Sequence, residues 1–308
     1  MMAAGIVDIA VPEVGTPIDN SYFESIGLTD EWIKRRSGIS RRRWLASDTS
    51  LAEVAAEACR PLVSRQDDPT TIGALIVVST SVRQRVPGIA QQVAALAGLT
   101  GSVLAFDMNA ACCGFVYALT TGLSLCDSGQ ARSVVVCTVE AMSTMVDKTD
   151  RQTACIFADG AAAVLLSARE QFAPFRHLAG GDGTQTALMR ETDAGGIHLD
   201  GAAVYERAVH RMTETAERLC AFDPRPSVLV GHQANGRILE QVRAFTTELE
   251  VPFINRIENL GNTSSASIPL AFGGALQDGS VPSQGRLGAV AYGAGEAWGG
   301  VSVSYGIG

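Results

Sequence analysis

Short apolar segments recur along the chain, and segments with a helical pattern of apolar and polar positions separate them. Four apolar runs are nearly continuous, which is typical of strands buried on both faces of a sheet. They cover residues 72–78, 103–106, 133–138 and 227–231. Residues 51–63 and 202–219 instead carry apolar side chains on one side at helical spacing. Strands that alternate with helices predict an α/β fold around a buried sheet.

The two parts of the chain repeat one plan. A strand, a few small residues, a polar or nucleophilic side chain and a helix follow one another at residues 103–119 and again from residue 227. Each part then ends on two strands around a glycine turn, at residues 153–167 and 289–304. We therefore expect two pseudo-repeated halves that face a shared site. Their expected bounds are residues 1–170 and 171–308.

Composition and charge exclude some classes of protein. Hydrophobic residues make up 46% of the 308 residues and charged residues 18%, which is ordinary for a globular protein with a substantial core. The net charge of -8 at pH 7 argues against a general binder of nucleic acids or anionic membranes, because both need a clustered positive field.

Cysteine usage indicates a reducing compartment. The seven cysteines form no C-x-x-C pair and no metal-ligand spacing, and their number is odd. No signal-peptide pattern and no uncharged apolar run of about 18 residues is present. We therefore expect a cytoplasmic protein.

The strongest candidate for chemistry is the pair Cys112 and Cys113, between the strand at residues 103–106 and a helix that begins at Gly114. A thiol at a helix N-terminus lies near unpaired backbone N–H groups and the positive end of the helix dipole, which favour a nucleophilic thiolate. Cysteine is also a common core residue, so this stretch alone leaves simple packing open.

Two polar residues in the second half are candidate catalytic residues. His232 follows a strand, where α/β sheets place ligands, although a structural histidine fits the same position. Asn262 lies in a Gly-Asn-Thr-Ser stretch, which by itself fits a turn with a helix cap. Each signal is weak alone, but their order and setting together are specific.

A possible nucleotide site lies near the N-terminus. Thr29 is a candidate cap for a helix that ends at Gly38, and Trp32 and Arg36 lie on one face of it. They fit either a surface helix with a half-buried indole or a stacking surface for a nucleotide with phosphates. Arg151 by itself fits a solvated loop cation.

In these stretches the sequence resembles the β-ketoacyl-acyl-carrier-protein synthase III family of the thiolase superfamily. The similar stretches follow in order along nearly the whole chain. They are residues 30–33, 37–39, 107–115, 149–151, 157–160, 231–235, 261–264 and 293–299. The resemblance implies a thiolase-like fold with five layers in the order αβαβα.

The resemblance also implies roles for single residues. Cys112, rather than Cys113, would be the acylated nucleophile, and His232 and Asn262 would complete a triad. The backbone N–H groups of Cys112 and Ala294 would stabilise an oxyanion. The positions that contact coenzyme A in the family correspond here to Trp32, Arg36, Arg151, Phe157 and Gly201.

The implied activity is that of an acyltransferase of the ketosynthase III type. An acyl-CoA starter and malonyl-acyl carrier protein would condense with loss of carbon dioxide, giving a 3-oxoacyl thioester for fatty-acid or polyketide biosynthesis. No metal or redox cofactor is needed, and a homodimer is expected. One alternative is transfer of the acyl group from Cys112 to a hydroxyl or an amine. A second is a non-catalytic subunit that only binds an acyl carrier.

Several positions bear on partners and on the starter. We expect an acidic carrier to dock on Arg207, Arg211, Arg237 and Arg243, which as an alternative are ordinary solvated arginines. Glu206 stands where the family often has a basic residue. Val86 corresponds to a position where a partner subunit limits the acyl pocket. Residues 168–200 form an irregular, glycine-rich junction, and the excursion at residues 178–200 is short for the family, so the starter stays open.

Overall fold

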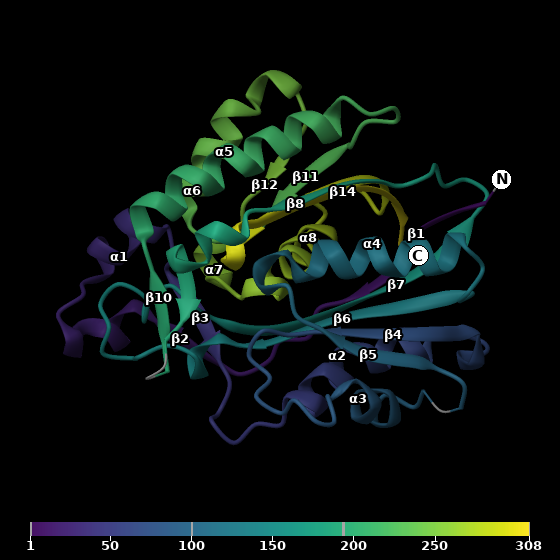
Figure 1. Ribbon diagram of the computed structural model, residues 1–308, viewed down its shortest axis with the longest axis horizontal. Coiled ribbons are helices and arrows are strands. Elements are labelled where there is room, and N and C mark those ends of the chain that lie inside the picture. Colours follow the sequence, from purple (N-terminus) through teal and green to yellow (C-terminus); the bar gives the residue numbers. More distant parts are fainter. Residues whose placement is uncertain (1, 100, 193–194, 308) are drawn as a thin grey trace.

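The computed structural model describes residues 2–99, 101–192 and 195–307, and Figure 1 shows the chain as layers of helices and strands. Within these ranges, ten strands form one sheet that consists of two half-sheets. The first half-sheet has the order β5 (Leu104–Met108), β4 (Ile72–Val78), β6 (Ser133–Ala141), β7 (Asp159–Arg169) and β1 (Ala3–Ala10). The second has the order β12 (Phe253–Ile254), β11 (Val228–Gly231), β13 (Gln284–Gly293), β14 (Ala297–Gly306) and β8 (Arg176–Gly181).

The half-sheets repeat one pattern of strand directions. β4 runs parallel to β5 and β6, as β11 does to β12 and β13. β7 and β14 run antiparallel to their neighbours within the half-sheets. A parallel contact between Ile6 and Tyr305 joins β1 to β14. The pseudo-repeat is therefore confirmed, whereas a domain boundary at residue 170, in the β7–β8 connection, stays a prediction.

Helices complete five layers. α4 (Gly114–Asp127) and α8 (Ser267–Gln277) lie between the half-sheets, as Figure 1 shows. α2 (Leu51–Ser64) and α3 (Ala90–Leu96) cover the outer face of the first half-sheet, and α5 (Gly201–Cys220) and α6 (Gly236–Phe245) cover that of the second. The central helices are apolar or small on most sides, as a helix between two sheets requires. The expected αβαβα arrangement is confirmed.

The hydrophobic core lies between these layers. Phe115 and Leu119 of α4 belong to the same core cluster as Ile268 and Phe272 of α8, and all four are at most 1% exposed. Burial of each such side chain stabilises the fold by roughly 1.5–3 kcal/mol. The middle layer therefore fixes α4, which follows Cys112 in the chain, and α8, which follows Asn262.

The remaining elements lie at the edges of this core. They are α1 (Asp30–Ser37), α7 (Ile257–Leu260), the hairpin of β2 (Thr16–Asp19) and β3 (Arg41–Trp44), and the pair β9 (Met189–Glu191) and β10 (Ile197–Leu199). In the part of the chain that the structure describes, no helix has the length and apolar character needed to cross a membrane.

Two segments differ from the sequence-based expectation. Residues 153–156 form turns rather than a strand, and Phe157 forms only an isolated bridge to Asn262. The Ile156 carbonyl and the Ala158 N–H bond to Asn262 instead of to a sheet neighbour. The junction at residues 168–200 contains β8, which pairs with β14. β8 lies at a sheet edge and buries little, so it carries no apolar run that would reveal it.

Candidate active site

Cys112 lies at a sharp turn between β5 and α4. It belongs to the short 3-10 helix Ala111–Cys113, and Ala111 adopts a φ of +46°, a conformation that side chains rarely take. Cys112 is 7% exposed and lines a cavity of about 850 Å³. Cys113 is fully buried and its thiol contacts the carbonyl of Ala297 at 3.2 Å. Of the two thiols, only that of Cys112 faces the cavity.

Burial dominates the ionisation of Cys112. It raises the pKa of the thiol to about 12, whereas the Ser264 hydroxyl at 3.9 Å and the backbone N–H groups of Cys112 and Ala294 act in the opposite direction. The nearby Glu140 carboxylate raises the pKa further. Burial therefore opposes the thiolate that a helix N-terminus favours, and with this raised pKa the thiol is neutral at pH 7.

His232 places a neutral imidazole at the cavity. Its backbone N–H donates to the carbonyl of Val290 at 2.8 Å, which continues the β11–β13 pairing. Its Nδ1 lies 2.7 Å from the hydroxyl of Ser267, and that hydroxyl already accepts the N–H of Gln233 at 3.2 Å. This contact fits a neutral ring in which Nδ1 accepts from the Ser267 hydroxyl and Nε2 carries the hydrogen. Burial lowers the pKa of His232 to about 3, so the ring is uncharged.

Backbone hydrogen bonds fix Asn262 beside the same cavity. Its N–H donates to Ile156 at 3.0 Å and its carbonyl accepts from Ala158 at 2.9 Å. Its side-chain oxygen accepts the N–H of Ser264 at 2.9 Å, and its Nδ2 contacts the carbonyl of Ala234 at 3.4 Å. The amide oxygen is thus occupied, and the remaining N–H of Nδ2 is free to meet a ligand. Cys112, His232 and Asn262 line one cavity.

Strained turns surround this site. Ala111, Ser264 and Glu296 adopt φ values of +46°, +49° and +50°, and each lies within two residues of Cys112, Asn262 or Ala294. Among the described residues, one further non-glycine residue, Glu250, has a positive φ. Such conformations persist where the surrounding structure fixes them, and they cluster at functional sites.

The turn of Ala294 packs closely on the nucleophile. Its N–H lies near the Cys112 thiol and favours the ionised sulfur. A Cβ at Gly293 would lie 2.9 Å from the Cβ of Cys112, so a larger residue there would displace one of the two segments. The expected pair of backbone donors, from Cys112 and Ala294, is therefore close to one sulfur atom.

The expected coenzyme A residues line the same cavity. The Arg36 guanidinium lies 5.5 Å from the centre of the Trp32 ring, and the Thr29 hydroxyl caps their helix as expected. The side chain of Arg151 donates to the carbonyl of Gly27 at 2.9 Å. Phe157, which is 3% exposed, and Gly201 complete this set. The cavity therefore extends from Cys112 to an exposed basic and aromatic surface.

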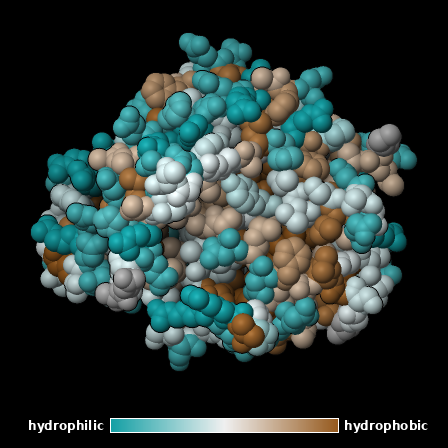
Figure 2. All heavy atoms as spheres, viewed as in Figure 1, coloured by the Kyte–Doolittle hydropathy of each residue, from teal (hydrophilic) through white to brown (hydrophobic). Residues whose placement is uncertain are grey.

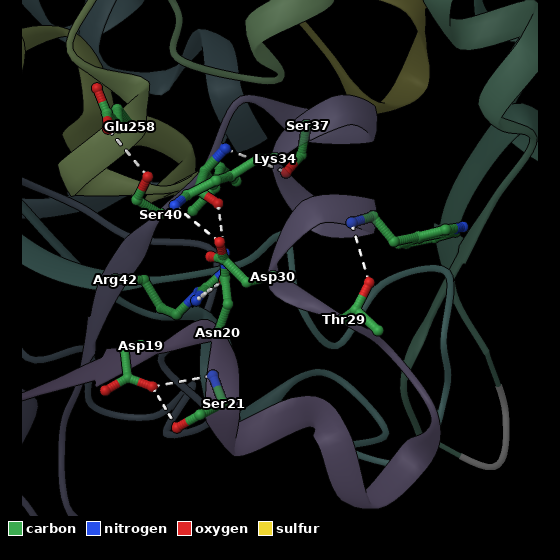
Figure 3. Close-up of polar contacts among 12 residues, drawn as sticks. Asp19, Asn20, Ser21, Thr29, Asp30, Lys34, Ser37, Ser40, Arg42 and Glu258 are labelled. Atoms are coloured by element: carbon green, nitrogen blue, oxygen red, sulfur yellow. Dashed lines mark hydrogen bonds and ion pairs between the residues drawn. The ribbon is translucent and has the colours of Figure 1, made fainter.

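A polar cluster fixes α1 at this surface. Figure 3 shows Asn20 between Asp30 and Arg42: its Nδ2 donates to Asp30 at 2.8 Å, and its oxygen accepts from Arg42 at 2.7 Å. Arg42 is fully buried and also donates to the carbonyl of Cys155 at 2.6 Å, and Cys155 lines the cavity. The base of α1 is thereby joined to the cavity wall.

The arginines expected to dock a carrier fall into two groups. Arg207 and Arg211, on α5, are each ion-paired with a glutamate of this chain. Arg237 and Arg243, on α6, are exposed and have no ion-pair partner among the described residues. The exposed positive charge therefore lies mainly on α6.

Val86 lies outside the cavity of its own chain. Its side chain is 91% exposed, and it is not among the cavity-lining residues. A role in the acyl pocket of a second copy stays a prediction.

One buried acid near the nucleophile was not anticipated. Glu140 is the penultimate residue of β6 and is fully buried, and its carboxylate accepts the Ser265 hydroxyl at 2.6 Å and the N–H groups of Thr80 and Ser81. Burial raises the pKa of Glu140. A single acid in an otherwise apolar run was the available signal, because buried acids are rare. Ser264 and Ser267, which contact Cys112 and His232, were also missed.

Comparisons with known proteins agree with this geometry. The family model "3-Oxoacyl-[acyl-carrier-protein (ACP)] synthase III" matches residues 106–183, and the model of its C-terminal part matches residues 226–305. A β-ketoacyl-[acyl-carrier-protein] synthase III of Jannaschia sp. is 34% identical over 92% of this chain and 93% of its own. One of Staphylococcus aureus is 31% identical over 94% of this chain and 95% of its own.

Solved structures give the same result. A 3-oxoacyl-[acyl-carrier-protein] synthase III of Aquifex aeolicus superposes with a TM-score of 0.91 at 30% identity, over 98% of this chain and 100% of the other. The priming β-ketosynthase of a polyketide biosynthetic pathway superposes with a TM-score of 0.90 at 26% identity, over 99% of this chain and 96% of the other.

Proposed function

Because the chain belongs to the 3-oxoacyl-[acyl-carrier-protein] synthase III family, we propose that it condenses an acyl-CoA starter with malonyl-acyl carrier protein through an acyl-Cys112 intermediate. The product is a 3-oxoacyl thioester for fatty-acid or polyketide biosynthesis. One observation carries this proposal: Cys112, His232 and Asn262 line a single cavity that extends to Trp32 and Arg36.

The first step exchanges one thioester for another. The Cys112 sulfur attacks the acyl-CoA carbonyl, the bond from that carbon to the coenzyme A sulfur breaks, and the thiol proton of Cys112 ends on coenzyme A. The backbone N–H groups of Cys112 and Ala294 stabilise the tetrahedral oxyanion. The exchange begins and ends with one neutral thiol and one thioester, so a thiol that is neutral at rest suits it.

The second step forms the carbon nucleophile. The malonyl group loses carbon dioxide, and the electron pair of the broken bond becomes an enolate on the thioester. Nε2–H of His232 and Nδ2–H of Asn262 donate to the enolate oxygen. Because the pKa of His232 is low, the ring is neutral and its remaining N–H is only a weak acid. The ring therefore stabilises the enolate without protonating its carbon.

The third step joins the two carbon chains. The enolate carbon attacks the acyl-Cys112 carbonyl, a carbon–carbon bond forms, and the bond to sulfur breaks. Cys112 leaves as a thiolate and regains a proton from solvent. The reaction needs no metal or redox cofactor, because decarboxylation supplies the electron pair.

The paired donors beside Cys112 also weigh against the alternatives. Transfer of the acyl group to a hydroxyl or an amine needs no enolate stabiliser, whereas His232 and Asn262 line the cavity as the two neutral groups that an enolate oxygen requires. A non-catalytic carrier-binding subunit would not require a nucleophile, a histidine and an amide in one cavity. Condensation therefore fits this arrangement best.

Partners and location belong to the same proposal. The exposed Arg237 and Arg243 on α6 favour docking of an acidic acyl carrier there. β5 is an edge strand whose Leu104 is 54% exposed, and Figure 2 shows hydrophobic residues gathered over this side of the face. An exposed apolar edge suits pairing with a second copy, as in a homodimer. Seven unpaired cysteines suit the cytoplasm.

Intact-protein mass tests the first step. We expect a panel of acyl-CoAs to add one acyl group to the wild type and to Cys113→Ala, and none to Cys112→Ala. Cys113→Ala is the matched control because its thiol lies outside the cavity. Label on Cys112→Ala, or no label on any variant, would contradict the proposal. The acyl group that labels fastest identifies the starter.

A further inference from the structure

The turn that carries the Ala294 donor is intrinsically unfavourable. Residues Ala294–Glu296 form the 3-10 helix η8 between β13 and β14, and Gly295 and Glu296 adopt φ values of +77° and +50°. Glycine takes this conformation readily, but glutamate does so rarely. Contacts from outside the turn must therefore hold Glu296 in place.

Glu296 has such contacts on each of its oxygens. Its side chain is 1% exposed, and its Oε1 lies 2.6 Å from Nη1 of Arg207. Its Oε2 accepts the hydroxyl of Tyr292 at 3.4 Å, and its backbone carbonyl accepts the N–H of Asp182 at 3.2 Å. The bond to Arg207 is the shortest and the only ion pair among these contacts.

Arg207 connects this turn to the wall of the cavity. It lies on α5, and its neighbours Glu206 and Ala208 both line the cavity, as do Gly201 and Tyr205 earlier in the helix. The ion pair thus spans from the cavity wall to the turn that packs on Cys112 and brings the Ala294 N–H near its sulfur.

Stability alone is a poor reason for this ion pair. Removing a carboxylate from water is costly, and a buried ion pair stabilises a fold no better than well-packed apolar residues. What the pair does provide is a directional contact at 2.6 Å to a residue in a rare backbone conformation.

We propose that Arg207 and Glu296 are positioning residues that hold the Ala294 N–H at the Cys112 sulfur and thereby set the rate of acylation. The inference rests on the proposed function, in which Ala294 stabilises the oxyanion of that step. It also gives Arg207 a role other than carrier docking. Neither residue touches the reacting atoms.

Three variants test the inference. Arg207→Met leaves the Glu296 carboxylate buried without its cation, so both stability and acylation should fall. Glu296→Gln keeps the shape of the side chain but weakens the contact. The double variant Arg207→Met with Glu296→Gln removes the unpaired charge and still lacks the ion pair. Arg218→Met is the matched control, because Arg218 forms an exposed ion pair on the same helix.

Four readouts separate positioning from general damage. For the double variant we expect acylation at saturating acyl-CoA to fall by about 10- to 100-fold, as for displaced oxyanion donors. We expect KM for acyl-CoA to change by less than about threefold, because the coenzyme A contacts are intact. Decarboxylation of malonyl-acyl carrier protein without a starter should stay near the wild-type rate, since His232 and Asn262 perform it. The melting temperature should recover from that of Arg207→Met.

The contrary outcomes are equally specific. A double variant that acylates as fast as the wild type overturns the inference. So does a parallel fall of acylation, decarboxylation and melting temperature, which indicates a structural role only. A wild type that no acyl-CoA labels overturns the proposed function and this inference with it, whereas a labelled wild type beside unaffected variants overturns this inference alone.

Discussion

At the scale of single residues, the site combines a buried thiol with neutral donors. Cys112 has a pKa raised to about 12 and His232 one lowered to about 3, and burial is the main cause of both shifts. Neither residue is charged at pH 7. A site of this kind stabilises charge that develops during the reaction without holding charge at rest.

The reactivity of Cys112 should depend on pH accordingly. We expect alkylation of Cys112 by iodoacetamide to rise about tenfold per pH unit from pH 7 to 9.5, because the thiolate fraction of a group with a pKa near 12 grows in that proportion. Intact-protein mass over time measures the rate, and Cys112→Ala gives the background from the partly exposed Cys220. A rate that levels off below pH 8 would show that Cys112 is a resting thiolate.

The sequence allowed some of these residues to be predicted and not others. Cys112 and His232 follow apolar strands, so their position at a strand end is visible in the pattern. The effect of burial on the pKa of Cys112 was not predicted, because burial depends on segments that are distant in the sequence. Ser267 was missed for the same reason: it lies 35 residues from His232, and only the fold brings the two together.

At the scale of elements, α8 is important because it carries Ser267 and packs between the half-sheets. Its two adjacent glycines face different surroundings. A Cβ at Gly273 would lie 2.5 Å from a methyl group of Val11, whereas a Cβ at Gly274 would meet nothing within 4 Å. The first glycine is therefore required by close packing, and the second is not.

This difference predicts opposite effects of one substitution. Gly273→Ala should lower the free energy of unfolding by about 1–3 kcal/mol, because it overfills the layer between the half-sheets. Gly274→Ala should raise it by about 0.5–1 kcal/mol, since alanine restricts the unfolded chain and favours the helix. Urea unfolding of both variants measures the change. Equal effects of the two substitutions would contradict the described packing.

The elements differ in how far their patterns revealed them. β4 matches the predicted run at residues 72–78. It could be predicted because a strand buried on both faces is apolar throughout. β8 was missed because it is an edge strand with exposed and polar positions. Residues 153–158 were predicted as a strand from their small, apolar composition, but their hydrogen bonds serve the loop of Asn262.

At the scale of the whole molecule, the pseudo-repeat explains why one cavity receives residues from both halves. Cys112 comes from the first half and His232 and Asn262 from the second, and the middle helices α4 and α8 begin next to Cys112 and Asn262. The repeat was visible in the sequence, but the order of the strands was not, because pairings such as β1 with β14 join opposite ends of the chain. The five layers were predicted only through the resemblance.

The most direct test of the central claim is a single-turnover measurement on acylated protein. The acyl-Cys112 form, freed of acyl-CoA, is mixed with malonyl-acyl carrier protein, and the Cys112 adduct, carbon dioxide and the carrier product are followed by mass and gas release. We predict that each acyl group lost from Cys112 yields one carbon dioxide and one 3-oxoacyl carrier, with Asn262→Ala slowed by about 100-fold. An adduct that persists with the malonyl carrier, and leaves only when an alcohol or amine is added, would contradict the account.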